Sequence, residues 1–593
     1  MPRSRYRTIT LGIGGREVSV AKCNYAKDAL GLKRASLLVD DVVRDLRVKA
    51  KTSLDTAIKR SFMLTSNQRI RRMRFPRSVY GGPLSACLLS SSILLLFTVV
   101  WTSPVSAAWV KKMSDRVQVG KRAAATYFVA TNGNDNETGS FEHPWATINH
   151  AASQARAGDT IIVRGGRYRL PAQVRPLHSG GPNAWITFIG LPGEDPVLDA
   201  KMIQRSSVVQ KGLDNGAFQI EDVSYIRVIN LAVANSHDTG FTVRDSSHIA
   251  LINNSTTSTF SSGIAVWDTS HDGRATRHIQ IIGNTIVKAN TWDLAPPDIP
   301  RQGEPPHEAI SVGGAVDFEV AYNHVYGSDK EGIDIKETSK FGRVHHNVVN
   351  GVDRQGIYID AWFGVLRGIE VYSNVIYDCS GAGLALSVEE GRSVEDINIH
   401  NNLVFNNEGS GLLFSRFGAD GSRRRVKIAH NVFYHNGYGP PKPGQKYYWI
   451  TGGLYFMSEN VGDIVIDKNV FSSNRGFQIG YSESLLERFR SWQNFASKRR
   501  IEIGKNVIYG RNSVNSPIEG GGDAFPYRGK IYAVNGQRPV FANPMFKDPV
   551  DRDFVSRRGF AAHGIRAGLW PPDSTFAWSW QHGFSPKLFT RAP

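Results

Sequence analysis

The segment DKEGIDIKETSK (329–340) combines acidic side chains with a lysine on a strand-like pattern. Ile333 and Ile335 alternate with Asp334 and Lys336, so the charged pair faces away from the apolar pair if the segment is a strand. Carboxylate oxygens are preferred ligands of hard cations such as Ca²⁺. An amine beside a bound cation loses its proton more easily and can act as a base.

Two neighbouring segments, which repeat the same alternation, add further ionisable groups. Glu308 lies in the earlier segment, and Arg354 and Asp360 lie in the later one. Adjacent strands of a sheet are about 4.8 Å apart, so Glu308, Glu331 and Asp334 can converge on one Ca²⁺ ion. We therefore predict these three as metal ligands and Lys336 as the base, with its pKa lowered by the cation and by Arg354. Arg354 and Asp360 are predicted to act on the substrate beside Lys336.

Four further side chains are predicted to contact a substrate. They are Tyr358, Trp362, Trp267 and Arg416. The aromatic rings can stack on a sugar ring or pack under loops, and the sequence leaves both possibilities open.

Two interleaved repeats organise the chain around these residues. One repeat is Gly or Ala followed by alternating apolar residues, as in GFTVR (240–244), GIDIK (332–336) and GLALS (383–387). The other ends in Asn, as in IALINN (249–254) and INIHNN (397–402), and is followed by a short apolar pair. A unit of about two dozen residues with three short strands buries its apolar face only when units stack.

The repeats predict an all-β protein, a right-handed parallel β-helix, over residues 108–593. Asn at each bend can adopt the left-handed conformation and bond to the Asn stacked on it. Residues 125–169 predict strand, loop, helix and strand, which would cap the N-terminal end. We expect the repeats over about 215–510 and a closing segment over 511–593.

The net charge of +18 is uneven along the chain. Residues 1–107 hold 19 Lys and Arg against 6 Asp and Glu, so the rest is nearly balanced and nucleic-acid binding is not expected. Within 69–107, a basic stretch, the apolar run at 83–101 and small residues near Ala107 predict a signal peptide for secretion or periplasmic export, or a membrane anchor. Residues 1–82 precede this run as an N-terminal extension. We expect a monomer that contacts a membrane only through the apolar run.

The chain resembles the secreted parallel β-helix polysaccharide lyases, which include pectate lyases, chondroitinase B and alginate lyases. In part of this group a catalytic lysine follows a calcium-binding carboxylate by five positions, as Lys336 follows Glu331, with another acid two positions earlier, as at Asp329. The resemblance implies that Lys336 removes the C5 proton of a uronic acid in an acidic polysaccharide while Ca²⁺ neutralises its carboxylate. Asp360 stands where the group places an arginine, and Arg354 or Arg416 would take that part.

Three other functions fit the same residues. Asp334 and Asp360 lie on a diagonal of roughly 8 Å, within the range of an inverting glycoside hydrolase. A uronate C5-epimerase shares the proton abstraction and differs in the fate of the carbanion. A non-catalytic carbohydrate-binding or surface protein needs the solenoid alone.

Overall fold

The computed structural model describes residues 9–13, 16–20, 123–203, 215–296, 305–440, 451–510 and 539–556. The chain divides into two compact units, Met1–Arg122 and Ala123–Pro593. In the first unit, β1 (Ile9–Ile13) and β2 (Arg16–Val20) form an antiparallel pair. The predicted export segment at 69–107 lies outside the described residues and stays a prediction. Among the described residues, no helix is long and apolar enough to cross a membrane.

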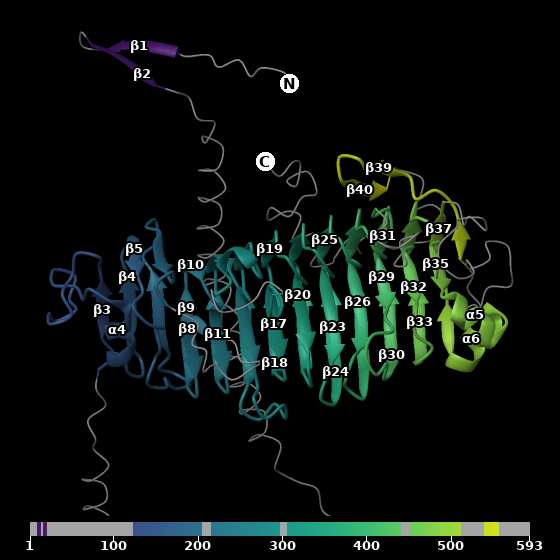
Figure 1. The fold of residues 1–593 in the computed structure, drawn as a ribbon, viewed down its shortest axis with the longest axis horizontal. Coiled ribbons are helices and arrows are strands. Elements are labelled where there is room, and N and C mark those ends of the chain that lie inside the picture. The colour runs from purple at the N-terminus through teal and green to yellow at the C-terminus, as the bar shows by residue number, and fades with distance from the viewer. Residues whose placement is uncertain are drawn as a thin grey trace, which may run out of the picture. The chain divides into compact units, whose positions relative to one another are not determined.

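The second unit is a parallel β-helix built from three parallel sheets, as the repeats predict (Figure 1). From β8 to β35, each coil contributes one strand to each sheet; the coils before β8 contribute strands to sheets 1 and 3 alone. The Asn repeat forms sheet 1, the apolar pair after it forms sheet 3, and the Gly repeat forms sheet 2. Sheets 1 and 3 have 13 strands each and sheet 2 has ten.

Within each sheet, the strands follow one another along the solenoid in chain order. Sheet 1 contains β3 (Thr126–Val129), β4 (Thr160–Val163), β6 (Ile186–Gly190), β9 (Ser224–Ile229), β12 (Ser247–Ile252), β15 (Arg277–Ile282), β18 (Val316–Ala321), β21 (Lys340–His345), β24 (Val365–Tyr372), β27 (Ser393–His400), β30 (Ser422–Ala429), β33 (Val461–Asp467) and β36 (Ile501–Ile503). Sheet 2 contains β8 (Gly216–Glu221), β11 (Thr239–Arg244), β14 (Ile264–Trp267), β17 (Ile310–Gly313), β20 (Ile333–Lys336), β23 (Ile357–Ala361), β26 (Leu384–Val388), β29 (Leu412–Phe414), β32 (Leu454–Phe456) and β35 (Ile479–Tyr481). Sheet 3 contains β5 (Gly166–Arg169), β7 (Pro196–Asp199), β10 (Ala232–Ser236), β13 (Ser255–Thr259), β16 (Thr285–Val287), β19 (His324–Tyr326), β22 (Val348–Asn350), β25 (Val375–Tyr377), β28 (Leu403–Phe405), β31 (Val432–Tyr434), β34 (Val470–Ser472), β37 (Val507–Tyr509) and β38 (Val540–Phe541).

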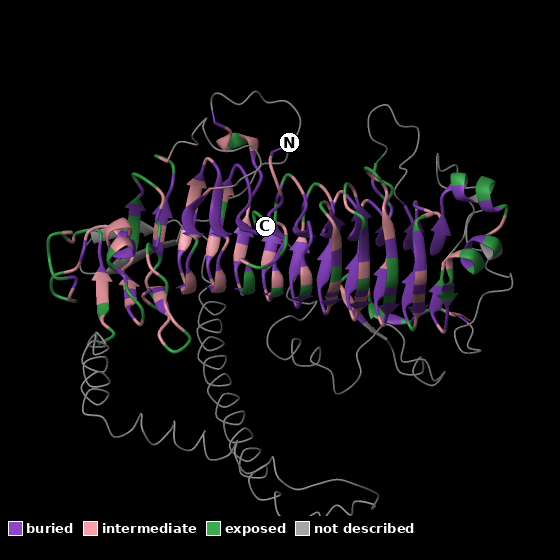
Figure 2. Cartoon of the chain, turned by 90° about the horizontal axis from the view of Figure 1, so that it is seen from below, coloured by how far each residue is buried: buried purple, intermediate pink, exposed green. Residues whose placement is uncertain are grey.

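One hydrophobic core runs through the solenoid, formed by alternate residues of the three sheets (Figure 2). In β20, Ile333 and Ile335 are fully buried in this core. Their neighbours Asp334 and Lys336 lie on the other face of the strand, because successive side chains alternate. The strand pattern thus places the charged residues on the outer face of sheet 2.

A ladder of buried asparagines joins the coils, as the sequence predicts. The amide nitrogen of Asn374 donates to Asn402 Oδ1 at 2.9 Å, and its own Oδ1 accepts from Asn347. The left-handed conformation, however, belongs to the residue before the ladder Asn, for example Ser373 with φ 53° and Asn401 with φ 56°. The prediction, which gave this conformation to the ladder Asn itself, was wrong on this point. The backbone N–H of each ladder Asn bonds to the Asn of the next coil, as Asn374 does to Asn402 Oδ1.

The ends of the solenoid differ in part from the prediction. β3 and β4 flank helix α4 (Ile148–Gln154), as expected, and Figure 1 shows α4 beside these strands. Capping by α4 stays a prediction. The coils begin well before residue 215, because β3 and β4 are already strands of sheet 1.

At the other end, two helices follow the last strand of sheet 2. These helices, α5 (Glu483–Phe489) and α6 (Trp492–Arg499), were not expected, and Phe489 and Phe495 join the main core. In the described part of the closing segment, β39 (Phe546–Asp548) pairs antiparallel with β40 (Asp553–Ser556). A short 3-10 helix, η1 (Trp292–Leu294), lies between β16 and β17.

The register of sheet 2 follows the Gly repeat up to its last coil. Asp334 pairs with Ser311 and Tyr358, and Lys336 pairs with Gly313 and Asp360, as the repeat predicts. In the last coil, Leu454 pairs with Ile479, two residues later than the repeat predicts. The shift coincides with a change in a second asparagine ladder, which is formed by Asn407, Asn436 and Asn474. Gln478 Oε1 accepts from Asn474 Nδ2 at 2.7 Å, where the earlier coils have an asparagine.

Candidate functional site

The three segments singled out in the sequence lie on adjacent coils of sheet 2. Glu308 precedes β17, Glu331 precedes β20, and Asp360 lies in β23. The acids are buried: Asp334 and Asp360 are 1% exposed, and Glu308 is 5% exposed. Outward-facing charges on a solenoid would ordinarily meet water, so a buried cluster of this kind needs internal pairing.

Lys336 lies at the centre of the cluster. Its Nζ atom lies 3.1 Å from Glu308 Oε1 and 3.4 Å from Asp334 Oδ2. The other oxygen of Glu308 accepts a hydrogen bond from Ser311 Oγ at 2.7 Å. Lys330 adds a second, more distant ammonium at 3.9 Å from Glu308. One amine therefore bridges carboxylates of two adjacent coils.

Burial and neighbouring charges shift the pKa values of Asp334, Glu308 and Lys336 in different directions. Burial raises the pKa of Asp334 well above its usual value, and the charge of Glu308 adds to that rise. Burial would also raise the pKa of Glu308, but the charges of Lys336 and Lys330, with smaller contributions from His307 and Ser311, together outweigh burial and the pKa falls below its usual range. Burial opposes the charged form of Lys336, yet the carboxylates of Glu308 and Asp334 raise its pKa well above the usual lysine value.

This charge pattern corrects one expectation about the lysine. The protein's own groups raise the pKa of Lys336 instead of lowering it. Arg354, which was expected to lower that pKa, places its Nε atom 3.2 Å from Glu331 Oε1. Gln355 Nε2 also reaches Glu331 Oε1 at 3.5 Å. Arg354 thus pairs with an acid of its neighbouring coil.

The predicted calcium ligands do not converge as a set. In the described part of the chain, no three or more His, Cys, Asp or Glu side chains are grouped to hold a metal ion. Asp334 Oδ1 and Glu331 Oε2 are buried without a hydrogen-bond partner, so each offers a free oxygen. Both oxygens of Glu308, however, lie within 3.2 Å of Lys336 Nζ. The ammonium occupies the place among the acids that a cation would take.

A second group of contacts surrounds Asp360 on the next coil. Trp362 Nε1 donates to Asp360 Oδ2, and the backbone N–H of Glu389 donates to Asp360 Oδ1 at 3.3 Å. Burial, with the charge of Glu389, raises the pKa of Asp360 well above its usual value. Tyr358, predicted to contact substrate, is 4% exposed and donates its hydroxyl to Glu389 at 2.6 Å.

Two of the predicted substrate contacts lie apart from this centre. Trp267 is 6% exposed, and its ring lies against Gly313 and 4.8 Å from the His307 ring, so it packs in the wall of the site. Arg416 is exposed and follows β29, three coils beyond β20. Three coil spacings are about 14 Å, which places Arg416 outside the cluster.

Two acids of the site were missed in the sequence. Glu389 follows, by two residues, Ser387, which pairs with Asp360 on the adjacent coil. Comparing the two coils beyond this pair would have found Glu389. Glu337 directly follows Lys336 and has a left-handed backbone with φ 63°. Its side chain is buried, and its Oε2 atom lies 3.9 Å from His271 Nδ1. No sequence signal marks Glu337, because the loop that covers it comes from a distant coil.

We expect Glu337→Gln to stabilise the protein at alkaline pH. Burial raises the pKa of Glu337 from 4.5 to about 7, so the folded state binds the extra proton between these values and stability falls as pH rises through them. The variant lacks this penalty and should gain about 2–4 kcal/mol over the wild type at pH 8 and little at pH 4.5. Denaturant unfolding at both pH values measures the difference.

The exposed Glu390 supplies the matched control. Glu390→Gln should change stability by less than about 0.5 kcal/mol at either pH. Equal effects of Glu337→Gln at pH 4.5 and pH 8 would show that the Glu337 carboxyl is not held in a low-dielectric site.

Comparisons with known proteins find similarity to right-handed β-helix regions. Residues 127–293 match the model described as Pel9A-like, right-handed beta helix region, and residues 216–393 match right-handed beta helix region. Residues 394–527 match disaggregatase related. The chain is a right-handed β-helix protein, and its residues 127–293 are similar to the Pel9A-like region. The Pel9A-like match ends before Glu308 and so does not include the charged cluster.

Individual relatives are more distant. The uncharacterized protein YwoF of Bacillus subtilis (strain 168) is 24% identical over 474 residues, which span 74% of this chain and 92% of YwoF. Pectate lyase PEL9 of Emericella nidulans is 29% identical over 116 residues, which span 19% of this chain and 28% of the enzyme. The crystal structure of pectate lyase Pel9A has 13% identity and a TM-score of 0.34, with 76% of this chain and 88% of that chain covered.

Proposed function

We propose that this protein is a polysaccharide lyase that cleaves a uronate-containing polysaccharide by β-elimination, with Lys336 as the base. The observation that carries the proposal is the buried amine of Lys336, bridged between Glu308 and Asp334 on adjacent coils. The Pel9A-like match supports the substrate class. Export of the protein, as the sequence predicts, would bring the site to such a polymer.

In this reaction Lys336 removes the proton at C5 of the uronate. The electron pair forms a double bond between C4 and C5, and the bond from C4 to the glycosidic oxygen breaks. Lys336 must first pass its own proton to a neighbouring carboxylate, and Glu308 at 3.1 Å is the nearest. The ion pair itself opposes this transfer, because it raises the pKa of Lys336 and lowers that of Glu308, so we assign the transfer to the substrate complex, from which water is excluded.

A second group must protonate the departing oxygen. Asp334 suits this part, because its raised pKa keeps it protonated at higher pH than an ordinary aspartic acid. Arg354, whose side chain is 39% exposed and pairs with Glu331, is assigned to bind the uronate carboxylate. Asp360, held by Trp362 and Glu389, is assigned to contact the sugar hydroxyl groups.

A carboxylate oxygen without a hydrogen-bond partner could hold Ca²⁺. Ca²⁺, when bound, would neutralise the substrate carboxylate, and Glu331, which is not assigned a proton in this scheme, has an oxygen available to hold it. The metal dependence is tested directly with a chelator.

Glycoside hydrolysis is a second candidate function, favoured by one observation. Asp334 and Asp360 both have raised pKa values while Glu308 stays ionised, and acids separated in this way are typical of a general acid and base pair. On this alternative Lys336 only maintains the charge balance of the carboxyl groups.

Incubation with a panel of acidic polysaccharides, with Ca²⁺ or with chelator, tests the proposal. We expect products with unsaturated ends, detected by their ultraviolet absorbance. Reducing ends without unsaturation would assign a hydrolase, and inverted uronates in uncut polymer would assign an epimerase. No change in any polymer would contradict an enzymatic function on these substrates.

A further inference from the structure

Between Tyr377 and Tyr509, a column of aromatic side chains on the outer face of sheet 3 is interrupted at one position. Tyr377, Phe405, Tyr434, Ser472 and Tyr509 pair in register from one coil to the next. Where the column is uninterrupted, the rings of Tyr377 and Phe405 stack with centroids 5.1 Å apart. Ser472 is the one small residue in this run, so no ring of the column lies between Tyr434 and Tyr509.

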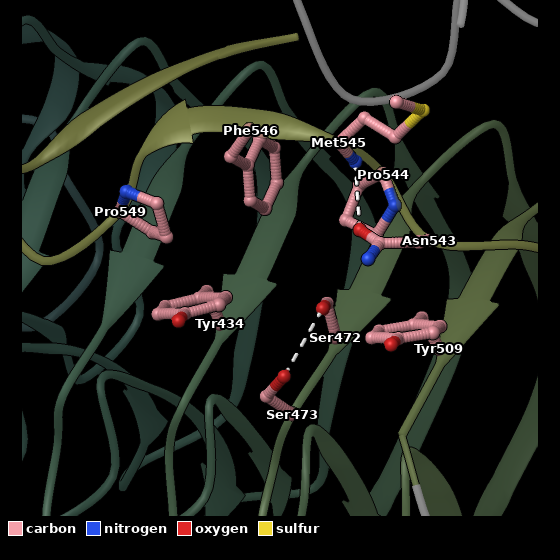
Figure 3. Close-up of a pocket in the computed structure, with 9 residues that line it drawn as sticks. All are labelled: Tyr434, Ser472, Ser473, Tyr509, Asn543, Pro544, Met545, Phe546 and Pro549. Carbon is pink, nitrogen blue, oxygen red and sulfur yellow. Dashed lines mark hydrogen bonds between the residues drawn. The ribbon is translucent and has the colours of Figure 1, made fainter. Parts of the chain in front are cut away.

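A cavity of about 330 Å³ lies at this gap, between the strands and the closing segment. Figure 3 shows Tyr434 and Tyr509 on either side of the serine pair, with residues 543–546 on the opposite wall. Tyr509 is 42% exposed, which leaves its ring accessible from solvent. The volume is at the lower end of the range for small-ligand sites and suits a single ring.

The lining of the cavity combines aromatic rings with neutral hydrogen-bonding groups. Ser472 Oγ lies 3.4 Å from Ser473 Oγ. Asn543 Oδ1 accepts from the backbone N–H of Met545 at 2.8 Å, and Figure 3 shows the Asn543 amide nitrogen directed toward the serines. Among the described residues that line the cavity, none carries a charge.

These features match the chemistry of a neutral sugar. A pyranose ring has an apolar C–H face that packs on aromatic rings and hydroxyl groups that bond to serine and amide groups. A uronate carboxylate would lose hydration there without a cation to pair with, which is costly. We propose that this cavity binds one neutral pyranose residue of a glycan, apart from the charged cluster on sheet 2. The proposal does not depend on the proposed lyase function.

Binding of neutral hexasaccharides of glucose, mannose, galactose or xylose to the full chain, measured by calorimetry, tests the proposal. A hexasaccharide of uronic acid serves as the charged comparison. We expect at least one neutral probe to bind, and Tyr509→Ala to weaken its affinity about tenfold or more. Ser472→Phe, which restores the ring missing from the column, should weaken it as much.

Tyr326→Ala is the matched control, because Tyr326 is an exposed tyrosine of the same column outside the cavity. This variant should bind within twofold of the wild type. Thermal unfolding of each variant checks that it is folded. The proposal is overturned if no neutral probe binds, if only the uronate probe binds, or if Tyr509→Ala and Ser472→Phe both retain wild-type affinity.

Discussion

Replacing Lys336 with methionine is expected to destabilise the protein by about 3–5 kcal/mol, because it leaves buried carboxylates without their cation. Glu308 loses a partner at 3.1 Å and Asp334 loses one at 3.4 Å. Lys336 is 8% exposed, so water cannot replace the lost ammonium. Denaturant unfolding near neutral pH measures the change in the free energy of unfolding.

Two variants control this experiment. Lys427→Met removes an exposed lysine of β30 and should change stability by less than about 0.5 kcal/mol. Adding Glu308→Gln to Lys336→Met removes the unpaired charge and should recover part of the loss. If Lys336→Met is as stable as the wild type, the ammonium does not hold the cluster together.

Asn374→Ala is expected to cost about 3 kcal/mol or more, since it interrupts the asparagine ladder in its middle. The substitution leaves the backbone N–H of Asn347 without its bond in a buried position. It also removes the bonds from the Asn374 amide to Val344 O and Asn402 Oδ1, although Asn402 Oδ1 keeps the bond from the backbone N–H of residue 374. Each buried polar group left unsatisfied costs about 1–3 kcal/mol. Thermal and denaturant unfolding provide the measurement.

Asn398→Ala provides the comparison for the ladder variant. Asn398 lies on the outer face of sheet 1, half-buried, with a single weak side-chain bond to Glu370 at 3.4 Å. Its loss should cost less than about 0.5 kcal/mol. Equal effects of the two substitutions would contradict a stabilising role for the ladder.

The fold could be predicted because its signals repeat. Alternating apolar residues mark the strands, and a buried Asn at the same place in each coil from β12 to β36 sets the register of sheet 1. The pattern fails in the last coil of sheet 2. There Gln478 takes the place of an Asn, and the register of β35 shifts by two residues. Helices α5 and α6 were missed because they follow the last repeat and have no counterpart in earlier coils.

The candidate site was predictable in position but not in its interactions. The register alone brings Glu308, Asp334 and Lys336 onto adjacent coils. Whether these acids hold a metal ion or the lysine depends on side-chain conformations, which periodicity does not encode. Burial of the cluster also depends on irregular loops, such as the one that places His271 beside Glu337.

The activity of Lys336→Arg on the polysaccharide that the wild type cleaves tests the role of this lysine most directly. Arginine keeps the positive charge that pairs with Glu308 but does not lose its proton in proteins. We predict a folded variant with at least about a thousandfold lower rate, in line with the loss of a general base, while Lys427→Arg keeps the wild-type rate. A Lys336→Arg variant that cleaves as fast as the wild type would contradict the account.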